Sequence, residues 1–237
     1  MTPRAGRVIV DGGIYHVLTR GNNGQAVFHH EADYHRYLEL LAAYAATHGL
    51  RVRHFVLMPT HVHLILEPVL GESLSRAMLG LNLAYVLYYQ KRYRYGGHLW
   101  RGRFTSVLLN RDGELLEHGR YVELHPVRSG LAADPANYAW SSYRVYADGV
   151  VSPPVEPHER YRLLGTDALQ RREQYRRFVL EGLQAQPLDP YPCLLLGRGG
   201  RGRPRKLQPA AGENVHVRTF PLGVVLSIVS RIWYGCW

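Results

Sequence analysis

The stretch from 57 to 67, Leu-Met-Pro-Thr-His-Val-His-Leu-Ile-Leu-Glu, constrains this chain more than any other part of its sequence. Its second half is a short apolar run bounded by Pro-Thr and by a later proline, which is typical of a strand. Because successive side chains of a strand point to opposite faces, His61 and His63 are expected on one face and Val62 and Leu64 on the other. The fold therefore has to bury one side of this strand while two imidazoles converge on the other.

Two converging imidazoles are half of a site for a divalent metal, since neutral imidazole binds many such ions. A zinc finger is excluded because the two cysteines, Cys193 and Cys236, lie far downstream and have no Cys-x-x-Cys spacing. The alternative is that one histidine is a hydrogen-bonded core residue and the other is solvated. The two histidines alone leave both interpretations open.

The residues around this strand alternate between strand and helix patterns. Periodicity and turn residues predict strands at 14–20, 51–58, 61–67 and 104–110 and helices at 33–49, 73–93 and 114–124, with Pro126 ending the last helix. The order of these elements predicts an α+β fold, a ferredoxin-like βαββαβ sandwich with an antiparallel sheet. Pro59 and Thr60 are expected to form the tight connection between the second and third strands.

Five short blocks of sequence between residues 6 and 148 resemble one family in their order and content. They are Gly13-Ile14-Tyr15-His16-Val17 with Arg20-Gly21-Asn22, the Met58-Pro59-Thr60-His61-Val62-His63-Leu64 strand, Gly97-His98-Leu99-Trp100-Arg101-Gly102-Arg103-Phe104, Tyr121-Val122-Glu123-Leu124-His125-Pro126-Val127-Arg128-Ser129-Gly130 and Trp140-Ser141-Ser142-Tyr143. The chain resembles the single-tyrosine transposases with an HUH motif (His, hydrophobic, His), and within them the IS200-like REP-associated tyrosine transposases. This resemblance implies the same ferredoxin-like fold.

The resemblance also implies an active site. In that family the Tyr of a Tyr-x-x-x-Asn-Pro motif is the nucleophile, and the polar residue four positions later completes the metal site. Carried to this sequence, the catalytic residue is Tyr121, the metal ligands are His61, His63 and His125, and the cofactor is a divalent metal, Mg or Mn. Tyr121 and His125 share a helix face at their i,i+4 spacing, whereas Glu123 is expected to point away from it.

The chain departs from the family at two of these positions. His125 and Thr60 each stand where the family has Asn. A site of three histidines is softer than one completed by an amide oxygen, so it favours Mn or Zn over Mg.

The function implied by the resemblance is a metal-dependent transposase that nicks and rejoins single-stranded or hairpin DNA through a 5′-phosphotyrosine. Two alternatives remain open. One is a domesticated, catalytically silent DNA- or RNA-binding protein of the same fold. The other is a small metal-dependent hydrolase that uses activated water in place of Tyr121.

The charge of the chain favours a polyanionic partner, because 29 Lys and Arg against 19 Asp and Glu give a net charge of +10. A first basic cluster, interleaved with aromatic residues as single-stranded DNA requires, comprises Lys91, Arg92, Arg94, Arg101 and Arg103. Within that segment Trp100 and Phe104 are expected to pack on the sheet, and Arg101 and Arg103 to face solvent. A second cluster, Arg201, Arg203 and Arg205, resembles an AT-hook, or else is a solvated linker with non-specific phosphate affinity.

Composition along the chain predicts three parts: a transposase domain at 1–148, a helical extension at 149–190 that begins with a Pro- and Gly-rich linker, and a flexible basic tail at 191–237. No signal peptide is visible before Asp11, and the most apolar late run is only about 11 residues, too short to span a bilayer. We therefore expect a cytoplasmic protein with no membrane partner, as a monomer or homodimer.

Overall fold

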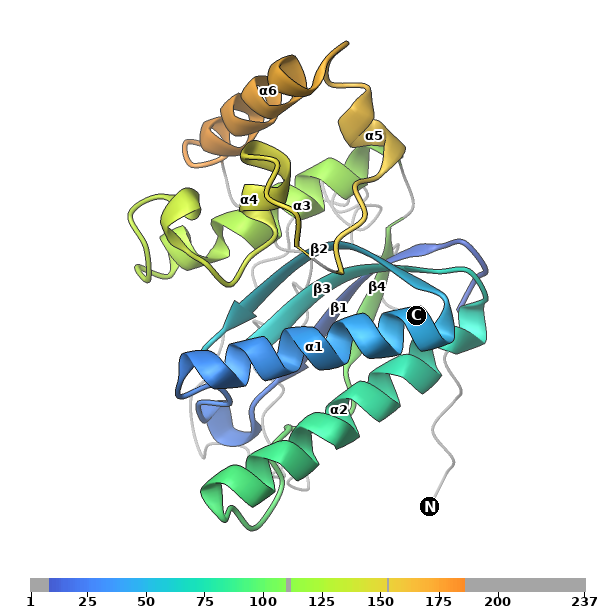
Figure 1. Ribbon diagram of the computed structural model, residues 1–237, viewed down its shortest axis with the longest axis vertical. Coiled ribbons are helices and arrows are strands. Elements are labelled where there is room, and N and C mark those ends of the chain that lie inside the picture. The colour runs from blue at the N-terminus through green and yellow to red at the C-terminus, as the bar shows by residue number, and fades with distance from the viewer. Residues whose placement is uncertain (1–8, 110–111, 153, 186–237) are drawn as a thin grey trace, which may run out of the picture. The chain divides into compact units, whose positions relative to one another are not determined.

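The computed structural model describes residues 9–109, 112–152 and 154–185. Its sheet contains β1 (Ile14–Arg20), β2 (Leu50–Met58), β3 (His61–Pro68) and β4 (Thr105–Leu109), all antiparallel to their neighbours, in the order β2-β3-β1-β4. Helices α1 (Glu31–His48) and α2 (Gly71–Tyr93) cover one face of the sheet, and α3 (Asp112–Arg128) covers the other (Figure 1). The predicted ferredoxin-like α+β fold is confirmed.

Side-chain alternation on β3 separates the core from the candidate site. Val62, Leu64 and Leu66 are buried in the cluster that packs the sheet against α1 and α2. Ile65 belongs to the apolar cluster under α3, and His61 and His63 lie on its side of the strand. The faces are those expected from the sequence, so the apolar alternate residues bury one side and leave the histidines under α3.

Helix α3 is longer than predicted. The expected end at Pro126 is wrong, because the helix runs from Asp112 to Arg128 with Pro126 inside it. Proline cannot donate a hydrogen bond to the preceding turn. The backbone nevertheless continues, since Ser129 N donates to His125 O at 3.0 Å and Leu131 N donates to Pro126 O at 2.8 Å. His125 therefore projects from within a helix rather than from its frayed end.

The approach of α3 to the sheet depends on a glycine. A Cβ added at Gly119 would lie 2.6 Å from Cε1 of His54 on β2, closer than real Cβ contacts allow. Four residues on, the fully buried Glu123 accepts a hydrogen bond from His54 Nδ1 at 3.0 Å. Glu123 also accepts from Ser142 Oγ and Tyr175 Oη, both at 2.7 Å. One carboxylate thus joins α3 to β2, to the residue before α4 and to α6.

The remaining helices are α4 (Tyr143–Ala147), α5 (Glu159–Arg162) and α6 (Ala168–Glu181), with the short turns η1 (Asn22–Gly24) and η2 (Pro135–Asn137). An apolar cluster around Leu124, Tyr146 and Tyr175 packs α4 and α6 on α3. The segment predicted as a linker follows the edge of β2, where Val155 pairs with Val52 and Glu156 N donates to Val52 O at 2.9 Å. The predicted domain boundaries stay predictions, and the tail 191–237 lies outside the described residues.

No helix in the described part of the chain combines the length and the apolar character that crossing a bilayer needs.

The Glu123 contacts generate a stability prediction. Glu123→Ala removes the shared acceptor of three buried donors. Ser142 Oγ keeps a second acceptor, Phe55 O at 3.4 Å, whereas the side chains of His54 and Tyr175 lose this acceptor in a buried environment. We expect the free energy of unfolding to fall by about 3 kcal/mol or more. Urea unfolding measures it, with Glu181→Ala on the exposed face of α6 as a control that changes it by less than about 0.5 kcal/mol. Equal losses in both variants would contradict a structural role for Glu123.

Candidate active site

Three histidines converge between the sheet and α3. His61, His63 and His125 each offer one ligand atom, and these atoms all lie within 4.8 Å of one another. Nε2 of His61 is 3.2 Å from Nε2 of His125, and the ring centroids of His63 and His125 are 4.9 Å apart. Among the described residues, these three side chains form the group with metal-binding geometry, and they are the predicted ligands.

Two strands and one helix position this group. The register of β1 on β3 sets Arg20 opposite His61 and Leu18 opposite His63, so the cationic end of β1 borders the histidines. The hydroxyl of Thr60 lies 2.9 Å from Nδ1 of His61, which leaves Nε2 of that ring directed at His125. Thr60 thus occupies a supporting position in the site.

Tyr121 lies beside the three histidines on α3. Its half-buried ring has its centroid 5.7 Å from that of His125 and 5.9 Å from that of His63. The i,i+4 spacing on the helix thus brings phenol and imidazole together as predicted. Glu123 lies apart, in the contacts to His54 described above, so it is not part of this site.

Two further histidines extend the cluster, and sequence reasoning missed them. Nε2 of His16, on β1, is 2.9 Å from Nδ1 of His63, and Nδ1 of His16 is 3.0 Å from Nδ1 of His118. Both side chains are buried. The available signals were the position of His16 on the opposite face from Tyr15 and the i−3 spacing of His118 from Tyr121. Neither becomes meaningful until β1 is known to pair with β3.

The cluster is electrostatically neutral at physiological pH. The pKa of His61 is lowered to about 3, first by burial and then by electrostatic repulsion from His125 and Arg20. Burial lowers the pKa of His118 and of His125 to about 4, and it holds the pKa of His16 and of His63 well below the usual 6.5. Neutral imidazole is the form that binds metals, so no proton has to leave before a cation enters.

The donor set fits a divalent metal ion. Three neutral ring nitrogens converge, and no carboxylate of the described residues joins them. Imidazole ligands suit first-row transition metals and zinc, whereas Mg prefers oxygen ligands. The site therefore fits Mn or Zn better than Mg.

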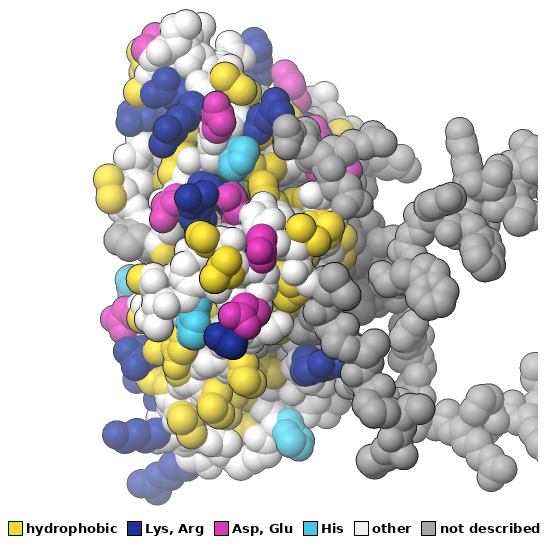
Figure 2. Space-filling view, turned by 90° about the vertical axis from the view of Figure 1, so that its right-hand side faces the viewer, with side chains coloured by type: hydrophobic (Ala, Val, Ile, Leu, Met, Phe, Trp, Pro, Cys, Tyr) yellow, Lys and Arg dark blue, Asp and Glu magenta, His cyan; other side chains and the backbone are white. Residues whose placement is uncertain are grey.

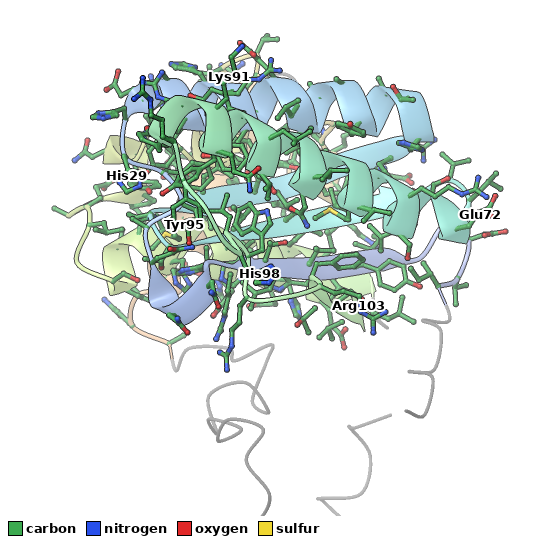
Figure 3. The ribbon with its side chains drawn as sticks, turned by 90° about the horizontal axis from the view of Figure 1, so that it is seen from below. His29, Glu72, Lys91, Tyr95, His98 and Arg103 are labelled. Atoms are coloured by element: carbon green, nitrogen blue, oxygen red, sulfur yellow. The ribbon has the colours of Figure 1, made fainter. Side chains whose placement is uncertain are left out.

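The first basic cluster lies in a segment joined to the end of the sheet that carries His61. Arg101 N donates to Arg20 O at 2.9 Å, and Asn22 N donates to Leu99 O at 2.8 Å, which ties this segment to the chain at the end of β1. Figure 3 shows Lys91 and Glu72 at opposite ends of α2, with Tyr95, His98 and Arg103 along the segment from α2 to β4.

In the segment that carries this cluster, the buried and exposed side chains are those predicted. Trp100 and Phe104 are buried, and the exposed cations are Lys91, Arg92, Arg94, Arg101 and Arg103. Arg92 lies 3.3 Å from the buried carboxylate of Asp33, so part of its charge is already matched. The second cluster, Arg201, Arg203 and Arg205, lies outside the described residues.

A further basic surface is visible on the extension. Figure 2 shows Lys and Arg side chains gathered near the top of the molecule, at the level of α5 and α6 in Figure 1. On α6 some of this charge is matched, since Arg176 lies 3.1 Å from Asp148 and 3.3 Å from Glu173. The extension therefore offers a weaker cationic surface than its arginine content suggests.

Comparison with known proteins finds one matching family model. The family model described as IS200-like transposase matches residues 9–125. Among solved structures the chain is similar to a REP-associated tyrosine transposase bound to a REP hairpin, with a TM-score of 0.52 and 14% identity over 62% of this chain and 86% of that chain. At this identity the likeness shows the shared fold.

Two other solved structures match with lower TM-scores. A Deinococcus radiodurans R1 protein assigned as a transposase has a TM-score of 0.35 and 20% identity, over 51% of this chain and 96% of that one. The tRNA(His) guanylyltransferase of Saccharomyces cerevisiae has a TM-score of 0.38 and 12% identity, over 74% of this chain and 81% of that one. A search of curated protein sequences finds no match.

The buried neutral histidines predict a pH dependence of stability in metal-free protein. Below pH 6.5 the unfolded chain binds protons that the folded cluster does not, so stability is full above that pH and is lost as the pH falls toward 4. Each such histidine contributes up to about 1.4 kcal/mol per pH unit.

Urea unfolding between pH 7 and 5 in EDTA measures this slope. His118→Gln removes one of the five groups. We therefore expect the unfolding free energy of this variant to change less steeply with pH, by the equivalent of up to one bound proton. His98→Gln, which replaces an exposed histidine by the same residue, is the matched control for the substitution. A slope in His118→Gln as steep as the wild type would show that His118 is not held neutral.

Proposed function

We propose that this chain, whose residues 9–125 match the IS200-like transposase family model, is a metal-dependent transposase that cleaves and rejoins DNA through a 5′-phosphotyrosine. The observation that carries the proposal is the position of Tyr121, whose ring centroid lies 5.7 and 5.9 Å from two members of a three-histidine group. A nucleophile beside a cation site is the arrangement that covalent phosphoryl transfer requires.

In the proposed reaction the phenolic oxygen of Tyr121 attacks the scissile phosphorus in line with the leaving 3′ oxygen. The new Tyr–O–P bond replaces the P–O3′ bond, and the proton lost from the phenol is balanced by the proton gained at the 3′-OH. His61, His63 and His125 would hold the divalent cation, which supplies Lewis-acid stabilisation of the phosphate charge when bound. Reversal of the step on a new 3′-OH rejoins the strand without an external energy source.

Two arginines place positive charge near Tyr121 and the three histidines. Arg128 interacts electrostatically with Tyr121. Arg20, at the end of β1, interacts electrostatically with His61 and His125. A phosphate that approaches the cation there would meet its guanidinium. Both residues therefore favour an anionic substrate at this site.

The substrate we propose is single-stranded or hairpin DNA. A half-buried tyrosine on a helix reaches a phosphate more readily in a flexible strand than in a regular duplex. The exposed cations of the first basic cluster stand in a segment rich in aromatic residues and joined to the His61 end of the sheet, which supports binding of a strand there. The likeness to a protein solved with a REP hairpin is consistent with this choice.

Tyr121→Phe tests the proposal with the smallest change available. It removes one oxygen, so we expect no covalent protein–DNA adduct on a denaturing gel while the DNA Kd stays within a few-fold of the wild type. Tyr44→Phe, on α1 at the other face of the sheet, is the matched control and keeps the adduct.

The same gel separates the alternatives. A nicked product without an adduct in the wild type would indicate a hydrolase that uses water. Binding without either product, in Mn²⁺ and Zn²⁺ alike, would indicate a catalytically silent DNA-binding protein. An adduct that survives in Tyr121→Phe would move the nucleophile to another residue.

We further propose that the second basic cluster, with Arg201, Arg203 and Arg205, contacts DNA. Ending the chain after residue 190 removes the five positive charges of 197–206, so the slope of log affinity against log salt should flatten by roughly 3 to 5 units, at about 0.7 to 0.9 per phosphate. Single-turnover cleavage at saturating DNA should persist, since Tyr121 and the three histidines remain.

Replacing the three arginines by Gln in the full chain is the control for loss of length. An AT-hook role further requires a larger loss of affinity on A·T-rich than on G·C-rich duplex, because the side chains would read a narrow minor groove. An unchanged salt slope would show that this segment does not contact DNA.

A further inference from the structure

The ring nitrogens of the histidine cluster form a connected row. Nδ1 of His63 contacts Nε2 of His16, and Nδ1 of His16 contacts Nδ1 of His118, at 2.9 and 3.0 Å. These rings are 2%, 0% and 7% exposed, so bulk water cannot replace one of them as a partner. The proposed function assigns roles to His61, His63 and His125 only, and it leaves His16 and His118 without one.

Each contact in this row has to contain one proton. Neutral imidazole is the form that binds a metal, and a neutral ring has one N–H and one acceptor nitrogen. Two directions satisfy the row. Either His63 donates from Nδ1 to His16 and His16 donates onward to His118, or every donor and acceptor is reversed.

The two directions differ at the metal site. In the first, the lone pair of His63 is on Nε2, and that nitrogen can bind a cation. In the reversed direction Nε2 of His63 carries the proton, and both nitrogens of the ring are unsuitable as ligands. Binding of a metal by His63 therefore requires His16 to act as an acceptor at Nε2.

We propose that His16 is a positioning residue for the metal site, which accepts the Nδ1 proton of His63 and thereby fixes the tautomer whose Nε2 binds a divalent cation. His118 completes the row as the acceptor for His16 Nδ1–H. This inference rests on the metal site of the proposed function and names the chain's own residues that prepare it. Metal-binding histidines commonly donate their second N–H to such a partner.

His61 has the same arrangement with a different partner. Its Nδ1 lies 2.9 Å from the hydroxyl oxygen of Thr60, which accepts that proton and leaves Nε2 for the cation. Both strand histidines therefore have Nδ1 occupied and the same nitrogen directed at the site. His16 is excluded as a further ligand in this arrangement, because both of its nitrogens already contact other rings.

Metal affinity, measured by calorimetry with Mn²⁺ on the full chain without DNA, tests the proposal. His16→Gln keeps an acceptor oxygen near the position of Nε2, whereas His16→Asn reaches only the position of Nδ1, toward His118. We expect the Asn variant to raise the Kd for Mn²⁺ by about 10- to 100-fold, and the Gln variant to stay within about 3-fold of the wild type. The Kd for Mn²⁺ of the His118→Gln variant, whose substitution lies one ring further from His63, should lie between those of the two His16 variants. Thermal unfolding of the metal-free variants checks that both His16 variants fold.

A spectroscopic signature separates this role from a purely structural one. In the Zn²⁺-loaded wild type, ¹⁵N–¹H NMR of the histidine rings should show His63 protonated at Nδ1 and metal-bound at Nε2. Coordination through Nδ1, equal affinity in the Asn variant and the wild type, or a Gln variant as weak as the Asn variant would each overturn the proposal.

The outcomes also distinguish this inference from the proposed function. Wild-type protein that binds Mn²⁺ with the expected ranking of variants but forms no Tyr121 adduct would overturn the transposase function and support the role of His16. Wild-type protein that forms the adduct but binds Mn²⁺ independently of residue 16 would overturn the role of His16 alone. Absence of Mn²⁺ and Zn²⁺ binding in the wild type would overturn the positioning role directly.

Discussion

The contact between α3 and the sheet is the constraint on which the candidate site depends. Its apolar residues, Leu115 and Val122, pack over the strands, but so would those of a helix displaced by a turn. Two features make the position specific: Gly119 admits the ring of His54, and Glu123 bonds that same ring from the next turn. Only in this register do the imidazole of His125 and the phenol of Tyr121 meet the histidines of β3.

The site combines two requirements that oppose each other in most proteins. A cation and a phosphate need polar surroundings, whereas the sheet under α3 needs a dry core. The chain meets both with neutral imidazoles, which pack as flat rings against one another and still present lone pairs. A carboxylate among them would demand a partner at all times, and the buried carboxylate of Glu123 on α3 has its partners on the other side of the helix.

Sequence reasoning was most accurate where signals are local. The bounds of β1 agree with the prediction, and the faces of β3 follow from alternation alone. It was wrong at Pro126, because the packing of α3 on the sheet and on α6 outweighs the one backbone hydrogen bond that proline removes. His16 and His118 could not be assigned, since their meaning depends on a pairing between segments about a hundred residues apart, for which no local pattern exists.

Tyr121 lies one helical turn from His125 on α3, so the proposed nucleophile and one of the proposed metal ligands share one helix. Any movement of α3 that carried a DNA strand attached to Tyr121 in the proposed reaction would therefore also move His125.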